Sequence, residues 1–210
     1  KFLREADGGN RLIHYEGIQS RRDHKTEINE DIYYTKLLDV ESRMYPSLDY
    51  MREKCLNDPR ENRPLILCEY AHSMGNSPGG LEDYSELIDS DDRIVGAFVW
   101  EWADHGIDFG DGKYRYGSDF DVEFSDGNYC IDGVFGPARE VKSAGLAFKA
   151  TNQPIKVKKI DGAKFRIFNR YDFITPENLL FTAVFRKNGE NVKSVEIDIS
   201  RILPHGFKDV

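Results

Sequence analysis

The sequence predicts an α/β fold with parallel strands, followed by a separate all-β region. Apolar, strand-like runs alternate with helix-like stretches, and two of these runs, residues 64–68 and 94–100, are almost continuously apolar. Strands of that composition are usually buried on both faces, as in parallel sheets, and the alternation is typical of such sheets. After residue 154 the apolar residues recur with period two instead, which predicts antiparallel β-structure in the rest of the chain.

The first two expected strands lie early in the chain. Residues 11–17 form a short strand-like run that ends in Gly17, and a second strand is expected within residues 37–46. Ser47 then suits the N-cap of a helix. Leu48, Met51 and Cys55 follow at spacings that place them on one face of that helix.

Two further strands bracket a second helix. Residues 64–68 form the third strand, and residues 94–100 form the fourth. Between them, Ser77 and Pro78 are typical of the N-cap and first position of a helix. Leu81, Tyr84 and Ile88 would then lie on its buried face.

A polar or aromatic residue stands at or near the end of each strand: Glu16, Tyr45, Glu69 and Trp100. In a (β/α)8 barrel the functional residues lie at the C-terminal ends of the strands. One such residue could equally be an ordinary loop residue, but four in series favour a barrel. Since eight units take about 250 residues, four strands within residues 10–104 correspond to half a barrel.

The sequence therefore predicts the C-terminal half of a TIM barrel, followed by part of an all-β, immunoglobulin-like sandwich domain. The barrel part spans residues 1–153. It includes a stretch rich in Gly, Asp and aromatic residues, 104–150, which we expect to be a long lid loop over the barrel mouth. Residues 154–210 contain four or five strands, too few for a complete sandwich of about 100 residues. Asp161-Gly162 predicts a type I′ hairpin turn there.

Composition excludes several classes of protein. The chain has 29 Lys and Arg against 37 Asp and Glu, a net charge of −8, and no dense basic stripe, so we expect neither nucleic acid nor an anionic membrane as a partner. No apolar run approaches the roughly 18 residues that span a bilayer, and no signal segment precedes the first strand. The 3 Cys are far apart and favour a reducing, cytoplasmic location, with the periplasm as the alternative.

The most informative segment is residues 63–77, in which the buried strand is followed by Glu69, Tyr70, Ala71 and His72 and then by a Gly/Asn turn. This segment resembles the nucleophile signature of glycoside hydrolase family 2, in particular of its large bacterial β-galactosidases. Residues 96–104, 116–120 and 128–133 resemble further segments of the same enzymes. The resemblance covers residues 10–160 well and the rest loosely.

The resemblance implies a role for each matching residue. Glu69 matches the catalytic nucleophile, and Tyr45 matches the tyrosine that hydrogen-bonds it. His72 matches a histidine that contacts galactose hydroxyls, and Trp100 matches the apolar platform under the sugar. This assignment agrees with the chemistry, because a retaining glycosidase needs an ionised nucleophile and a tyrosine hydroxyl favours the anion.

Tyr129 and Asp132 match a site for a monovalent cation, Na⁺ in the family, through a backbone carbonyl and a side-chain oxygen respectively. Asp132 also matches a substrate-binding position. The best-known family member has Asn at this position and Phe at the position of Tyr129. The extra negative charge of Asp132 leaves both ion preference and sugar contact open.

Each assignment has a plainer alternative. Glu69 could begin a helix or form a salt bridge, His72 and Trp100 could be structural, and Asp132 could be an ordinary loop carboxylate. Three further carboxylates are weaker candidates for the site: Glu16, Glu101 and Asp104.

The second carboxyl that the mechanism requires is not found in this sequence. In the family it lies in an Asn-Glu dipeptide followed by Ser-Gly-His, at the end of the fourth barrel strand. Asn29-Glu30 lies in a polar stretch with no strand before it, so we do not assign it. We expect the acid/base glutamate, together with the Mg²⁺ ligands that surround it in the family, to precede Lys1, which is not a natural start.

The predicted function is that of a retaining β-galactosidase fragment. The intact, homo-oligomeric enzyme would hydrolyse terminal non-reducing β-D-galactosides such as lactose, whereas this chain alone would be inactive. Two alternatives stay open. One is another family 2 glycosidase, a β-glucuronidase or β-mannosidase, and the other is a non-catalytic carbohydrate-binding or complementation module.

Overall fold

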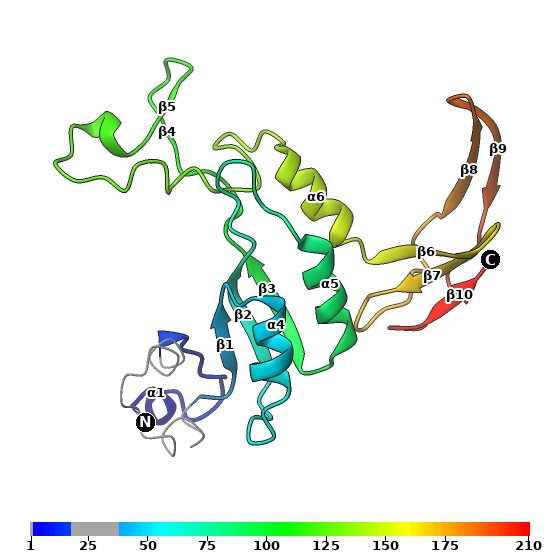
Figure 1. The fold of residues 1–210 in the computed structure, drawn as a ribbon, viewed down its shortest axis with the longest axis horizontal. Helices are drawn as coiled ribbons and strands as arrows, with labels where there is room; N and C mark the ends of the chain where they lie inside the picture. Colours follow the sequence, from blue (N-terminus) through cyan, green and yellow to red (C-terminus); the bar gives the residue numbers. More distant parts are fainter. Residues whose placement is uncertain (1, 18–37) are drawn as a thin grey trace. The chain divides into compact units, whose positions relative to one another are not determined.

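The computed structural model describes residues 2–17 and 38–210 (Figure 1). The chain divides into two compact units, residues 1–151 and 152–210. The sequence placed this boundary two residues later, between residues 153 and 154. Each unit has its own sheets and its own small core, and they are taken in turn below.

The first unit is built on a three-stranded parallel sheet with the order β1-β2-β3. The strands are β1 (Glu41–Met44), β2 (Leu65–Tyr70) and β3 (Ile94–Val99), so the expected strands in 37–46, 64–68 and 94–100 are confirmed. Met44 pairs with Glu69 and Tyr70 pairs with Val99. The C-terminal ends of all three strands therefore meet at one edge of the sheet.

Helices connect the consecutive strands, as a barrel segment requires. Helix α4 (Leu48–Tyr50) continues as the π-helix η1 (Met51–Leu56) and precedes β2, and α5 (Leu81–Ser90) precedes β3 (Figure 1). The predicted N-cap is confirmed, because the Ser47 hydroxyl accepts the Tyr50 N–H at 3.2 Å. The core lies between the sheet and these helices and includes the fully buried Met51, Leu65 and Leu67.

A buried ion network lies at the opposite, N-terminal end of the strands. Arg93 forms an ion pair with Glu41 and donates to the carbonyls of Arg63 (2.9 Å) and Cys55 (2.6 Å). Glu41 also accepts from Arg43 at 2.7 Å. Burial raises the pKa of Glu41 although both guanidinium groups oppose this. Removing one partner of a buried ion pair costs about 3–5 kcal/mol, so this end of the sheet serves stability.

The expectation of a strand at residues 11–17 is wrong. Among the described residues, Ile13 makes one backbone hydrogen bond to the next segment, in which Ile13 O accepts the Asp39 N–H at 3.0 Å. The Asp39 carboxylate accepts the Ile13 N–H at 2.7 Å, whereas in a strand pairing a backbone carbonyl would accept it. Arg4, in the short helix α1 (Phe2–Ala6), also donates to that carboxylate. The described residues thus hold three parallel strands where the sequence predicted four.

The predicted start of α5 at Ser77 is also wrong. The helix begins at Leu81, with Gly80 as its N-cap residue. Gly80 has φ 69°, a left-handed conformation that glycine adopts at little cost and that interrupts a helical path from Ser77.

The segment 104–150 is only partly the expected lid loop. It contains the hairpin of β4 (Ile107–Asp108) and β5 (Tyr114–Arg115) and the 3₁₀ helix η2 (Gly117–Phe120). Its last residues belong to helix α6 (Ser143–Thr151), where the expectation of a loop is wrong. Ala, Leu and Lys are strong helix formers, and Phe148 packs against the core of the first unit.

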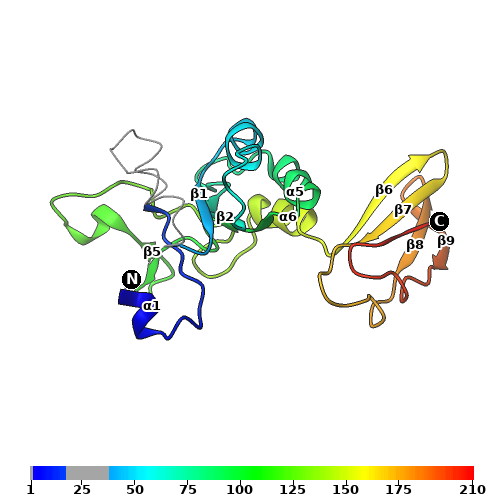
Figure 2. The ribbon, with the colours of Figure 1, turned by 90° about the horizontal axis from the view of Figure 1, so that it is seen from below.

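The second unit is made of antiparallel strands. Strands β6 (Ile155–Asp161), β7 (Lys164–Asn169) and β10 (Phe207–Asp209) form one sheet, with β6 and β7 side by side (Figure 2). Strands β8 (Thr182–Lys187) and β9 (Glu190–Glu196) form a separate hairpin. A small cluster of Ile167, Ile199 and Ile202 is buried in this unit.

The two hairpin turns of this unit differ. Asp161 pairs with Lys164, so the loop is Gly162-Ala163, and only Gly162 has a positive φ. The predicted type I′ turn at Asp161-Gly162 is therefore wrong, because that turn needs positive φ at both loop residues. Asn188 and Gly189, with φ 52° and 86°, meet that requirement between β8 and β9.

Within the described residues, no helix combines the length and the apolar character needed to cross a bilayer.

Candidate active site

The C-terminal ends of the three parallel strands bring Tyr45, Glu69 and Trp100 together. Tyr45 follows β1, Glu69 is the last residue but one of β2, and Trp100 follows β3. Backbone hydrogen bonds tie these ends to one another, from Tyr45 N to Glu69 O (2.9 Å) and from Trp100 N to Tyr70 O (3.0 Å). Sheet pairing therefore sets the spacing of the three side chains.

Tyr45 and Glu69 interact directly. The Tyr45 hydroxyl donates a hydrogen bond to the Glu69 carboxylate; burial and then this bond raise the pKa of Tyr45, so the phenol stays protonated. Tyr45 has φ 47°, a left-handed conformation that costs a non-glycine residue about 1–3 kcal/mol. The hydrogen bond from its N–H to Glu69 holds it in that conformation.

Asp132 joins Trp100 and His72. It is 1% exposed, and its Oδ2 accepts the Trp100 Nε1–H at 3.0 Å and lies 3.4 Å from His72 Nε2. Its second oxygen, Oδ1, is buried and has no hydrogen-bond partner among the residues that the structure describes. A buried carboxylate oxygen in that state is an acceptor open to a cation or a ligand donor.

Ring contacts extend the cluster. The His72 ring meets the Tyr45 ring edge-on at a centroid distance of 5.7 Å and the Tyr129 ring at 6.1 Å. The structure thus gathers all six residues singled out in the sequence at one edge of the sheet: Tyr45, Glu69, His72, Trp100, Tyr129 and Asp132.

The three weaker candidates differ in their surroundings. Asp104 accepts the Gly133 N–H at 2.8 Å and forms an ion pair with Lys142 at 2.9 Å, so it holds the 130–135 segment in place. Glu101 lies 2.9 Å from His105 Nε2, and burial followed by its contact with Asp132 raises its pKa. Glu16 lies near Cys68. Burial raises the pKa of the Cys68 thiol, and the negative charge of Glu16 raises it further.

Sequence reasoning missed His105 and Lys142. His105 could have been found from its position four residues after Glu101. Lys142 gave no local signal, because it follows Asp104 by 38 residues and the loop between them brings the two together.

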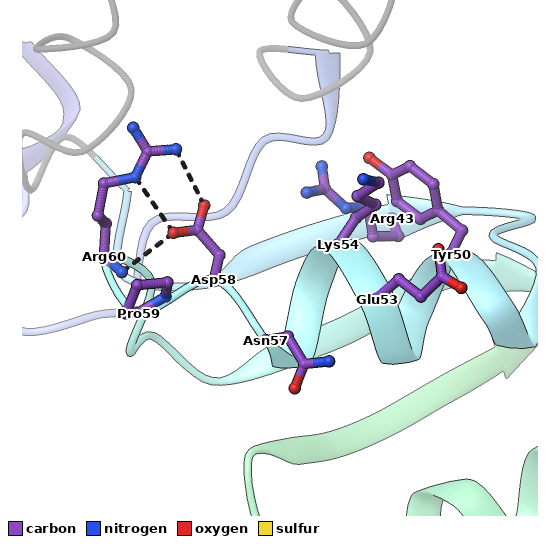
Figure 3. A pocket seen from close by; sticks show the side chains of 8 residues that line it. All are labelled: Arg43, Tyr50, Glu53, Lys54, Asn57, Asp58, Pro59 and Arg60. Carbon is purple, nitrogen blue, oxygen red and sulfur yellow. Dashed lines mark hydrogen bonds and ion pairs between the residues drawn. The ribbon is translucent and has the colours of Figure 1, made fainter.

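Away from this cluster, a hollow of about 460 Å³ lies beside η1 (Figure 3). The residues that line it are Arg43, Tyr50, Glu53, Lys54, Asn57, Asp58, Pro59 and Arg60. None of the six residues lines it. Figure 3 shows Asp58 and Arg60 bound to each other on one side, with Arg60 Nε 3.2 Å from Asp58 Oδ1. Charges that neutralise each other in this way make it a weak candidate for a ligand site.

Comparison with known proteins agrees with the fold. A model of the family described as "Glycosyl hydrolases family 2, TIM barrel domain" matches residues 1–157. The β-galactosidase of Staphylococcus xylosus is 40% identical over 200 residues, which cover 93% of this chain and 20% of that protein. The β-galactosidase of Kluyveromyces lactis is 37% identical, with 86% of this chain and 17% of that protein covered.

The β-galactosidase of Priestia megaterium is 33% identical over 215 residues, which cover 100% of this chain and 19% of that protein. The chain thus spans about a fifth of the length of the curated relatives it matches. Parallel strands whose C-terminal ends carry the candidate functional residues are the class feature of barrel enzymes. Within that class, the chain belongs to glycoside hydrolase family 2.

Proposed function

We propose that the full-length protein containing this chain is a retaining β-galactosidase that hydrolyses terminal non-reducing β-D-galactosides such as lactose. The observation that carries the proposal is the Tyr45–Glu69 hydrogen bond at the strand ends, surrounded by His72, Trp100 and Asp132. The names of the relatives support galactose as the sugar.

Glu69 is the proposed nucleophile. One of its carboxylate oxygens attacks the anomeric carbon, and the bond from that carbon to the leaving oxygen breaks. A second carboxyl group gives its proton to the leaving oxygen. The same group then takes a proton from water, whose oxygen displaces Glu69 and yields the free sugar with retained configuration.

That second carboxyl is proposed to come from a part of the full-length protein outside this chain. Asn29-Glu30, which the sequence analysis did not assign, lies outside the described residues. The short span of this chain against its relatives supports a donor elsewhere in the protein.

The remaining residues bind and orient in this proposal. The Tyr45 hydroxyl donates to Glu69, which favours the ionised nucleophile. His72 contacts sugar hydroxyls, and the face of Trp100 covers the apolar C–H face of the ring. Trp100 cannot rotate freely, because its Nε1–H is bound to Asp132.

The buried Oδ1 of Asp132 fits an oxygen ligand for a monovalent cation, since hard cations prefer oxygen donors. We propose that Asp132, with the backbone carbonyl of Tyr129, holds Na⁺. When bound, the ion would supply positive charge beside Asp132 and a ligand position for a sugar hydroxyl. Among the described residues, no three His, Cys, Asp or Glu side chains cluster around a possible metal position. Mg²⁺ with ligands outside this chain stays a prediction.

Two further statements belong to the same proposal. Residues 152–210 would form part of an immunoglobulin-like sandwich, completed by strands outside this chain. The intact enzyme would assemble as a homo-oligomer.

Substitution of the nucleophile tests the function. In the full-length protein, Glu69→Gln should lower kcat for a nitrophenyl β-D-galactoside by at least about 10³-fold, because an amide cannot form the glycosyl-enzyme ester. A 2-deoxy-2-fluoro-galactoside with a good leaving group should label the wild-type peptide containing Glu69, as read by mass spectrometry, and should leave Glu69→Gln unlabelled.

The matched control is Glu53→Gln, at an exposed position of η1, which should retain wild-type turnover. Labelling of a different carboxylate would refute the assignment of Glu69. Turnover of a β-glucuronide or β-mannoside in preference to the galactoside would refute the substrate.

A further inference from the structure

Tyr84 of helix α5 reaches the residue that follows Tyr45. Its hydroxyl donates a hydrogen bond to the Pro46 carbonyl at 2.7 Å, across 38 residues of sequence. Pro46 is buried, and a buried carbonyl that lacks a donor costs free energy. Burial raises the pKa of Tyr84, so its phenol stays protonated and able to donate. Helix α5 is therefore tied to the turn that carries Tyr45.

The core of the first unit fixes the position of Tyr84. Leu81 and Leu87, on either side of it in α5, are buried in that core. The Tyr84 ring also meets the Tyr70 ring edge-on, at a centroid distance of 5.6 Å. Tyr70 is the last residue of β2 and directly follows Glu69. The Tyr84 hydroxyl is thus held at a fixed place beside the end of β2, although the pattern of α5 alone indicates no more than a packed ring.

The backbone of Tyr45 needs an anchor on both sides. Its φ of 47° is left-handed, and the next residue is a proline, whose ring favours an extended conformation in the residue before it. A residue in such a conformation stays there only when its surroundings hold it, and such residues gather at functional sites. The Tyr45 N–H donates to Glu69 O at 2.9 Å on one side, and Tyr84 holds the Pro46 carbonyl on the other.

We infer that Tyr84 is a positioning residue for the nucleophile, because it holds Tyr45 in the conformation from which the Tyr45 hydroxyl reaches Glu69. The inference rests on the proposed function, in which Glu69 attacks the anomeric carbon. Without the Tyr84 hydroxyl, the Pro46 carbonyl loses this donor and Tyr45 relaxes toward the extended backbone that proline favours. The Tyr45 hydroxyl then moves away from the Glu69 carboxylate, which is left less well oriented for attack.

The rate of attack by Glu69 tests the inference. In the full-length enzyme, Tyr84→Phe removes the hydroxyl and keeps the ring against Tyr70. Mass spectrometry follows the labelling of the peptide containing Glu69 by a 2-deoxy-2-fluoro-galactoside. The rate constant at saturating reagent should fall about tenfold, less than the roughly 100-fold expected for a displacement of about 1 Å. The final amount of label per protein should stay at the wild-type value, because loss of folded protein would lower that amount and not the rate constant.

A double-mutant cycle separates positioning from packing. Because Tyr84 acts through Tyr45, the variant with both Tyr45→Phe and Tyr84→Phe should be labelled at the same rate as Tyr45→Phe alone. The matched control is Tyr171→Phe, which removes a tyrosine hydroxyl from the second unit and should leave the rate at the wild-type value. A wild-type rate in Tyr84→Phe, or two losses that multiply in the double variant, overturns the inference while the galactosidase assignment stands. If the wild-type enzyme is neither labelled nor active on a nitrophenyl galactoside, the proposed function itself is wrong, and the inference falls with it.

Discussion

Gly133 sets how closely the segment that carries Asp132 can approach the end of β3. A Cβ on this glycine would lie 2.2 Å from Asp104 N and 2.4 Å from Ala103 Cα. Both are backbone atoms, which cannot relieve the clash by rotating as a flexible side chain could. The Gly133 N–H also donates to the Asp104 carboxylate at 2.8 Å, which Lys142 holds from the other side.

The substitution Gly133→Ala should therefore displace Asp132 from Trp100 and His72. Since a misplacement of about 1 Å can cost about 100-fold in rate, kcat/KM of the full-length enzyme should fall 10- to 100-fold. Steady-state kinetics checks this, with circular dichroism to confirm folding. Gly79→Ala is the control, because a Cβ there meets nothing within 4 Å. Equal activity of the two variants would contradict the role of the close approach.

At the scale of elements, the Asp39 side chain holds residues 11–17, which form no strand, against the start of the sheet. It accepts the Ile13 N–H at 2.7 Å and forms an ion pair with Arg4 of α1 at 2.9 Å. The Ile13 hydrogen bond and then Arg4 hold the pKa of Asp39 below its ordinary value of 3.8. A carboxyl whose pKa is lowered by folding stabilises the fold above its ordinary pKa, and this contribution is lost as pH falls through the lowered value.

We therefore expect the contact of residues 11–17 with Asp39 to loosen below about pH 4. Hydrogen exchange, corrected for the intrinsic rate at each pH, should show lower protection of the peptide containing Ile13 at pH 3 than at pH 6. In Asp39→Asn the difference between the two pH values should disappear. Equal protection of the wild-type peptide at both pH values would rule out this role of Asp39.

At the scale of the whole molecule, the parallel sheet has open edges within the described residues. Strands β1 and β3 each pair only with β2 there. Val95 and Phe98 of β3 are 58% and 61% exposed. Unpaired, apolar edge strands favour association with other chains.

The 210-residue chain on its own should therefore associate in solution. Light scattering should give a mass well above 24.2 kDa, and Val95→Lys should lower it, because a charge on an edge strand opposes pairing. Asn57→Lys adds the same charge at an exposed position outside the strands and should not change the mass. A monodisperse monomer in the unaltered chain would contradict this expectation.

The sequence by itself determined the parallel strands, the Ser47 cap and the six candidate residues. Continuous apolar runs, capping chemistry and the Glu69–His72 segment are local signals, legible without knowing what each residue contacts. Family membership also followed from that segment.

Tertiary structure decided the rest, because those features depend on contacts between distant residues. The Asp39 carboxylate accepts the N–H of Ile13, 26 residues earlier in the chain, and no strand forms there. Lys142 met Asp104 across 38 residues, and helix α6 formed where composition indicated a loop. The buried Asp132 joins Trp100 and His72 only because the 130–135 segment meets the strand ends in space.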